Sequence, residues 1–222
     1  MRTCWSCGKR FGARGDALTC SAACRKARQR GRQAPRSARL AQAWGLKPGD
    51  FWRTPAWLIA AMRLRYPIGF DACATPEDAV CAQYITPEQN SLMTSWAPFA
   101  LFGWGFWNPP YGNDLLSWVQ KAASERDAGV SSLGLVPPAT GSRYMQRADQ
   151  EAAEICLIRG RIPFIHPDTG KPVSGNRGDS CFIVMDSARP GPARWTYVEL
   201  SELRDRGVAA MDQVPHRFPI SA

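Results

Sequence analysis

Residues 99–111 read FALFGWGFWNPPY, an apolar run that ends in an asparagine, two prolines and a tyrosine. An apolar run closed by a rigid turn is typical of a buried strand that delivers a polar residue to the edge of a sheet. There the Asn108 carboxamide oxygen and the Pro109 carbonyl can both accept hydrogen bonds from an exocyclic amine. Tyr111 offers a flat face on which a base can stack. The pattern favours a site that holds an amino group for attack on a methyl donor.

Strand-like and helix-like segments alternate from Asp50 onward. Thr54 and Pro55 predict a helix start, with Thr54 as N-cap and Pro55 at the first helical position. A second helix is expected from residue 113 or 114 to about Gly129. Strands are expected over residues 68–74, 99–107, 130–136, 154–158, 162–165, 180–186 and 194–200. This order predicts an α/β fold with a doubly wound, mostly parallel sheet and an antiparallel edge.

The charge of the chain is unevenly distributed. The net charge of the 222 residues is +9, but residues 1–40 alone hold eleven Lys or Arg and one acid. A basic arm on a nearly neutral domain indicates a polyanionic partner such as nucleic acid, and a solvated, disordered tail is the alternative. No apolar stretch is long enough to span a membrane, and no signal peptide follows Met1. We therefore expect no membrane partner and a cytoplasmic location.

Four cysteines near the N-terminus have the spacing of a metal site. They form a CxxC pair and a CxxxC pair, separated by twelve residues: Cys4, Cys7, Cys20 and Cys24. Two close pairs joined by a loop can bring four thiolates to one tetrahedral Zn²⁺. The alternatives are two disulfides, which a reducing compartment disfavours, and four unrelated thiols. We expect a zinc-binding module with a basic arm over residues 1–33, a linker over 34–49 and the main domain over 50–222.

Several other segments accompany the WNPPY sequence of residues 107–111. They are DFWRTP at 50–55, FDACA at 70–74, YIT at 84–86, EQNSL at 88–92, LVPPAT at 135–140 and GRIPF at 160–164. In this order they resemble the phage-type DNA N6-adenine methyltransferase family, over roughly residues 50–182. The N-terminal cysteines, followed by several arginines, resemble short bacterial treble-clef-like zinc fingers.

The resemblance implies a Rossmann-like fold that uses S-adenosyl-L-methionine (AdoMet) to methylate adenine N6 in DNA. It implies that Asn108, Pro109, Pro110 and Tyr111 form the catalytic turn. The implied cofactor residues are Thr54 and Pro55 at the methionine moiety, Asp71 at the ammonium, Glu88 at the ribose hydroxyls and Asn90 as a further candidate. A glycine-rich loop after the first strand, usual in better-known methyltransferases, is missing from this sequence.

The residues themselves leave other interpretations open. Asp71 could stabilise a turn, and Glu88 could be a solvated loop acid. The turn at Asn108 would also accept the N4 amine of cytosine or a glutamine amide of a protein. A DNA-binding protein that kept the fold but lost catalysis is the alternative from another class. The basic N-terminal module favours nucleic acid over protein as the substrate.

Overall fold

The computed structural model describes residues 1–4, 7, 9–12, 17–26, 52–111, 114–173 and 178–213. The chain divides into two compact units, Met1–Phe51 and Trp52–Ala222. In the first unit, strands β1 (Arg2–Thr3) and β2 (Arg10–Phe11) pair antiparallel, and residues 22–26 are helical. The expected linker, residues 34–49, lies outside the described residues. Within the described ranges, no helix has the length and apolar character needed to cross a membrane.

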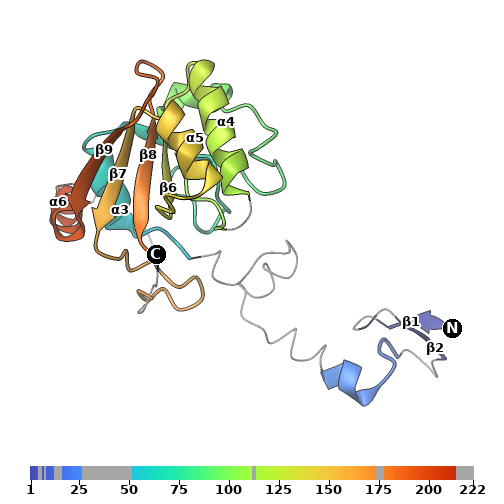
Figure 1. The fold of residues 1–222 in the computed structure, drawn as a ribbon. Helices are drawn as coiled ribbons and strands as arrows, with labels where there is room; N and C mark the ends of the chain where they lie inside the picture. Colours follow the sequence, from blue (N-terminus) through green and yellow to red (C-terminus); the bar gives the residue numbers. More distant parts are fainter. Residues whose placement is uncertain are drawn as a thin grey trace. The chain divides into compact units, whose positions relative to one another are not determined.

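A seven-stranded sheet forms the centre of the second unit (Figure 1). Its strands are β3 (Ile68–Asp71), β4 (Gln83–Tyr84), β5 (Trp104–Trp107), β6 (Ser132–Val136), β7 (Glu154–Arg159), β8 (Ser180–Met185) and β9 (Arg194–Glu199). Their order across the sheet is β4-β3-β5-β6-β8-β7-β9. Every neighbouring pair is parallel except the two that involve β8. The expected mostly parallel α/β sheet is thereby confirmed.

The antiparallel strand lies inside the sheet and not at its edge. β8 pairs with β6 on one side and with β7 on the other. All six residues of β8 are buried, as befits a strand covered on both faces and paired on both sides. The two edges are β4 and β9, and β9 runs parallel to β7 and leaves Arg194, Trp195, Tyr197 and Glu199 exposed.

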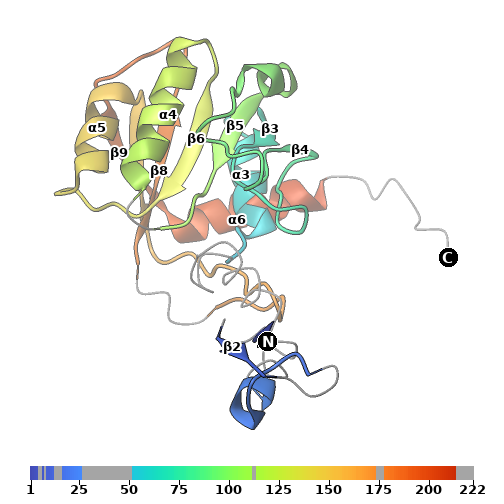
Figure 2. The same ribbon diagram turned by 90° about the vertical axis from the view of Figure 1, so that its right-hand side faces the viewer.

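Helices cover both faces of the sheet (Figures 1 and 2). They are α3 (Ala56–Arg63), α4 (Leu115–Asp127), α5 (Arg143–Glu151) and α6 (Leu200–Asp212). On one face, α4 and α5 bury Val119 and Met145 in a cluster with Trp107 of β5. On the other face, α3 and α6 bury Leu58 and Leu203 against different side chains of the same strands. The sheet is therefore doubly wound.

The apolar run of residues 99–107 forms two elements instead of the single strand expected. Ala97–Phe102 is a 3₁₀ helix, η2, and β5 begins only at Trp104. Gly103 separates them with a φ of 131°, a conformation that other residues rarely adopt. The backbone of η2 also passes close to β3, because a Cβ at Gly69 would lie well under 3.0 Å from the carbonyl oxygen of Phe102.

Two further segments differ from the expectations. Residues 162–165 contain only two isolated bridges, from Ile165 to Arg53 and from Ile165 to Pro172, in place of a strand. The end of the described chain is the helix α6, which the sequence pattern did not predict. α6 approaches α3 closely at Gly207, where a Cβ would lie well under 3.0 Å from the carbonyl oxygen of Trp57.

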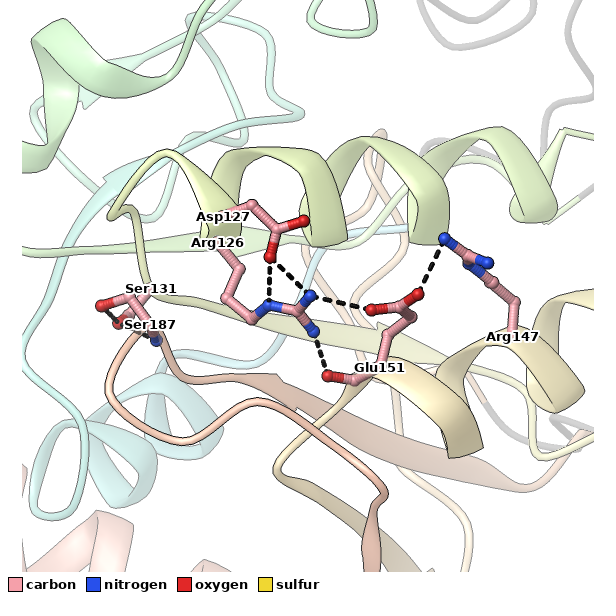
Figure 3. Close-up of polar contacts among 6 residues, drawn as sticks. All are labelled: Arg126, Asp127, Ser131, Arg147, Glu151 and Ser187. Carbon is pink, nitrogen blue, oxygen red and sulfur yellow. Dashed lines mark hydrogen bonds and ion pairs between the residues drawn. The ribbon is translucent and has the colours of Figure 1, made fainter.

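An ion network centred on the buried Arg126 joins α4 and α5 where both helices end (Figure 3). The Arg126 side chain, 5% exposed, donates to Asp127 at 2.6 Å and to the Glu151 carboxylate at 2.8 Å. Arg126 also donates to the backbone carbonyl of Glu151, and Arg147 pairs with the same carboxylate at 2.7 Å. Because α4 leads directly into β6, this network lies at the amino ends of the parallel strands. The network therefore stabilises the fold at the end of the sheet opposite the carboxyl ends of these strands.

Candidate active site

The carboxyl ends of β4, β3 and β5 lie side by side along one edge of the sheet. Asp71, the last residue of β3, is in register with Tyr84 of β4 and with Phe106 of β5. The amide of Ala72 donates to the Phe106 carbonyl at 2.7 Å, which continues this pairing beyond the strand. Ligand sites of open α/β sheets are built from the loops at such strand ends. The segments that follow Asp71, Tyr84 and Trp107 therefore share one edge.

Asn108 directly follows β5 and is held from two sides. Its Nδ2 donates to the hydroxyl oxygen of Thr54 at 3.2 Å. Its Oδ1 accepts from the Tyr111 hydroxyl at 3.0 Å. Pro109 is buried and Pro110 half-buried, so the turn has a fixed backbone. The structure thus brings Thr54 together with the predicted catalytic turn.

Tyr111 presents its ring and its hydroxyl to different surroundings. The residue is 36% exposed, which leaves part of the ring accessible for stacking. Its hydroxyl is desolvated, and this raises the pKa of the phenol well above the ordinary value. The hydroxyl therefore stays protonated at neutral pH and acts as a hydrogen-bond donor to Asn108.

Thr54 does not cap the helix that follows it, contrary to expectation. Pro55 occupies the N-cap position of α3, and no side chain caps this helix end. The Thr54 hydroxyl accepts from Asn108 instead. The preceding residue, Arg53, exchanges two backbone hydrogen bonds of 2.9 Å with Ile165. This pairing fixes the segment that carries Thr54.

Asp71 is buried and closes the loop after β3. Its two carboxylate oxygens accept from the backbone amides of Cys73 at 3.0 Å and Val80 at 3.1 Å. Burial raises the pKa of Asp71 to about 7, although these two hydrogen bonds act in the opposite direction. Within the described part of the chain, no Lys or Arg forms an ion pair with it. A desolvated carboxylate without a counter-ion among the described residues suits a cationic ligand group.

Glu88 and Asn90 lie on the turn after β4, and both are exposed. Asn90 adopts a φ of 51°, in the left-handed region that asparagine tolerates better than most residues. The described hydrogen bonds do not link either side chain to Thr54, Asp71 or Asn108. The structure places both residues at the neighbouring strand end without joining them to the other predicted site residues.

The four N-terminal cysteines form a separate cluster in the first unit. Their sulfur atoms all lie within 4.8 Å of one another, and Cys20 Sγ is 3.6 Å from those of both Cys7 and Cys24. These separations exceed any disulfide bond and match the edge of a tetrahedron about a Zn²⁺ with bonds of ~2.3 Å, which is about 3.8 Å. The Cys24 amide donates to the Ser21 hydroxyl at 3.1 Å, which caps the helical residues 22–26. The donor set and its spacing fit one tetrahedral metal ion.

Comparison with known proteins identifies the family. The family described as DNA N-6-adenine-methyltransferase (Dam) matches residues 45–210. This chain belongs to that family. A DNA N-6-adenine-methyltransferase of Haemophilus phage HP1 is 30% identical to this Dam-family chain over 164 residues, covering 72% of the chain and 92% of the relative. One of Escherichia phage T1 is 30% identical over 165 residues, covering 67% of each protein. A solved structure, a predicted O-methyltransferase from Agrobacterium tumefaciens, covers 69% of the chain and aligns over 97% of its own length, with a TM-score of 0.38 and 11% identity.

The family match confirms the resemblance and the activity expected from the sequence, methylation of DNA at adenine N6. The roles of single residues in this Dam-family chain stay predictions. Sequence reasoning missed the hydrogen bond between Thr54 and Asn108. The two residues are 54 positions apart in the chain, and neither the helix start nor the proline turn carries a signal of the other.

Proposed function

We propose that the chain transfers a methyl group from AdoMet to adenine N6 in DNA at the edge formed by the ends of β3 and β5. One observation carries this assignment in a chain of the Dam family. The Asn108 carboxamide stands directly after β5 and is bound through its Nδ2, which leaves its oxygen as an acceptor at the sheet edge. An exocyclic amine is the substrate group that such an acceptor suits.

Two acceptors on this turn can activate the amine without a strong base. The lone pair of adenine N6 is delocalised into the ring, which makes the nitrogen a poor nucleophile. When Asn108 Oδ1 and the Pro109 carbonyl accept hydrogen bonds from the two N–H groups of the amine, its nitrogen moves toward tetrahedral geometry. The lone pair of that nitrogen then becomes available. AdoMet supplies an electrophilic methyl group when it is bound. The protein then lowers the barrier chiefly by holding the amine in line with that group.

Tyr111 supplies the surface on which the target base rests. A base inside a duplex cannot reach the turn at Asn108, so it must leave the stack at a cost of a few kcal/mol. Stacking on an aromatic side chain returns ~1–3 kcal/mol of that cost. The partly exposed ring of Tyr111 is adjacent to the amine acceptor, which supports this role.

The family resemblance implies the cofactor residues, and the chemistry of the strand ends supports them. The Asp71 carboxylate fits the AdoMet ammonium because it is buried and, among the described residues, forms no ion pair with a Lys or Arg. The uncapped start of α3, after Thr54 and Pro55, suits the cofactor carboxylate. Glu88, on the turn after β4, suits the ribose hydroxyls, with Asn90 beside it as a further candidate.

The N-terminal unit adds a zinc site and a DNA contact. Cys4, Cys7, Cys20 and Cys24 would hold one Zn²⁺, since their spacing fits a tetrahedral thiolate site. The basic residues of positions 1–40 would contact the phosphates of DNA. The phage origin of the matched relatives supports action in the cytoplasm of a bacterium or an infected host cell.

Labelled AdoMet and DNA test the proposal directly. After incubation with the full chain, the DNA is digested to nucleosides, and N6-methyladenine is the expected product. Asn108→Ala should abolish product while the purified variant still binds AdoMet. N4-methylcytosine as the only product would overturn the adenine assignment, and an active Asn108→Ala variant would overturn the site.

A further inference from the structure

We propose that Thr54 is a positioning residue that fixes which end of the Asn108 carboxamide faces the target amine. This inference rests on the proposed function, because it assigns Asn108 Oδ1 as the amine acceptor. It gives Thr54 a role beyond cofactor contact. The hydrogen bond from Asn108 Nδ2 to Thr54 Oγ1, at 3.2 Å, carries the argument.

A carboxamide has two chemically opposite ends. Its oxygen only accepts hydrogen bonds and its NH₂ only donates them, and rotation by half a turn exchanges the two. In the orientation observed, Oδ1 accepts from the Tyr111 hydroxyl and retains a second lone pair for the amine. After half a turn, Nδ2 would face the N–H groups of the substrate, donor against donor. The reaction therefore needs a group that retains Nδ2 on the side away from the amine.

Thr54 is that group. Within the described ranges of the chain, its hydroxyl oxygen is the only acceptor that Nδ2 meets. Without this oxygen, the half-buried Nδ2 would rely on water, and the protein contact that retains the amide in this orientation would be lost. The Thr54 backbone is held independently of the side chain, since Arg53 and Ile165 exchange two hydrogen bonds of 2.9 Å. Ile162 and Phe164, close in sequence to Ile165, are buried in the core and anchor that segment.

The Tyr111 hydroxyl completes the arrangement from the other side. It donates to Asn108 Oδ1 at 3.0 Å and so occupies a position that an N–H of the amine would take. An amide oxygen has two lone pairs, so this donor can share Oδ1 with the amine or move aside. In the free protein, the Tyr111 hydroxyl binds the oxygen end of the amide and the Thr54 hydroxyl binds the nitrogen end. In the orientation observed, the two hydroxyls bind opposite ends of the amide and hold it in place.

Substitution of Thr54 by valine and by serine tests this role. Thr54→Val retains the shape of the side chain but removes the acceptor, whereas Thr54→Ser retains the acceptor. With AdoMet saturating, we expect Thr54→Val to lower kcat by about ten-fold, because the half-buried Nδ2 loses its hydrogen-bond partner, while AdoMet affinity stays within about two-fold. Thr54→Ser should restore most of kcat.

Other outcomes have distinct meanings. A Thr54→Val variant with weak AdoMet binding, but normal kcat once AdoMet is saturating, would show a cofactor contact and overturn the positioning role. Wild-type kcat and affinity together would overturn it too, and the methyltransferase assignment would still stand. The assignment of the site to Asn108 would be overturned only if the Asn108→Ala variant were active. If Thr54→Val does not fold, Thr54→Ala compared with Thr54→Ser makes the same test.

Thr196→Val, which loses a hydroxyl bonded to Glu154 in the β7–β9 region, is the matched control and should leave kcat within about two-fold.

Discussion

The indole ring of Trp107 lies against the backbone of Gly134, in the space that any other side chain would fill. A Cβ at Gly134 would be well under 3.0 Å from three atoms of this ring. The ring nitrogen donates to the Ser132 hydroxyl at 3.2 Å, and Trp107 is fully buried. Because Asn108 follows Trp107 directly, the packing between β5 and β6 sets where the carboxamide stands.

Gly134→Ala should therefore impair both stability and turnover. The added methyl displaces the Trp107 ring, and overpacking of this kind costs about 1–3 kcal/mol of unfolding free energy. Thermal unfolding and kcat measure the two effects. Gly141→Ala is the control, since a Cβ there meets no atom within 4 Å. Normal stability and kcat in Gly134→Ala would show that the ring position does not depend on this glycine.

The stability of the cofactor-free protein should fall as pH rises from about 4 to about 7, through Asp71. The folded protein raises the pKa of this carboxyl to about 7, so it binds a proton that the unfolded chain has already released. A raised carboxyl pKa favours the folded state at low pH, and that contribution is lost as pH rises toward 7. The slope from one such group is at most about 1.4 kcal/mol per pH unit. Urea unfolding across this range should show a flatter profile for Asp71→Asn than for the wild type.

AdoMet affinity should rise with pH over part of the same range. A cofactor ammonium beside Asp71 favours the ionised carboxylate, so binding releases a proton wherever the free site is protonated. Between pH 6 and 7, below the usual pKa of an α-amine, the dissociation constant should fall by about five-fold. Calorimetry in two buffers of different ionisation enthalpy measures the released proton. An affinity independent of pH in the wild type would place the ammonium elsewhere.

Zinc content should depend on the four N-terminal cysteines alone. Protein purified without chelator should hold one Zn²⁺ per chain, and Cys20→Ser should remove it, because three thiolates and a hydroxyl bind Zn²⁺ far less well. Cys81→Ser, a free cysteine of the second unit, should retain the metal. Elemental analysis decides between these outcomes, and full zinc retention by Cys20→Ser contradicts the assignment.

Removal of residues 1–40 should weaken DNA binding and make it less sensitive to salt. These residues hold eleven basic side chains and one acid. Each lost phosphate contact lowers the slope of log affinity against log salt by about 0.9. AdoMet binding by the truncated chain should persist, since the predicted cofactor residues all lie beyond residue 50. An unchanged salt slope would mean that this arm does not touch DNA.

Local patterns predicted the local elements of this fold. Buried apolar runs gave the positions of β6, β7 and β8, and the turn at Asn108 follows its strand as expected. The place of β8 inside the sheet could not be read from its residues, because strand order depends on pairing between distant segments. The hydrogen bond between Thr54 and Asn108 has the same long-range origin. Gly103 carried a local signal for the break between η2 and β5, since a glycine inside an apolar run often marks an irregular backbone.

The interior place of β8 has a consequence for the order in which the sheet can be assembled during synthesis. β3, β4, β5 and β6 find all their mutual partners within the first 136 residues, so the half of the sheet that carries Asn108 can form early. β7 emerges next but pairs only with β8 and β9, which are made after it. It must wait until residues 180–185 insert between it and β6. A chain that stops before residue 180 leaves the buried edge of β6 open, and an open apolar edge pairs with other chains.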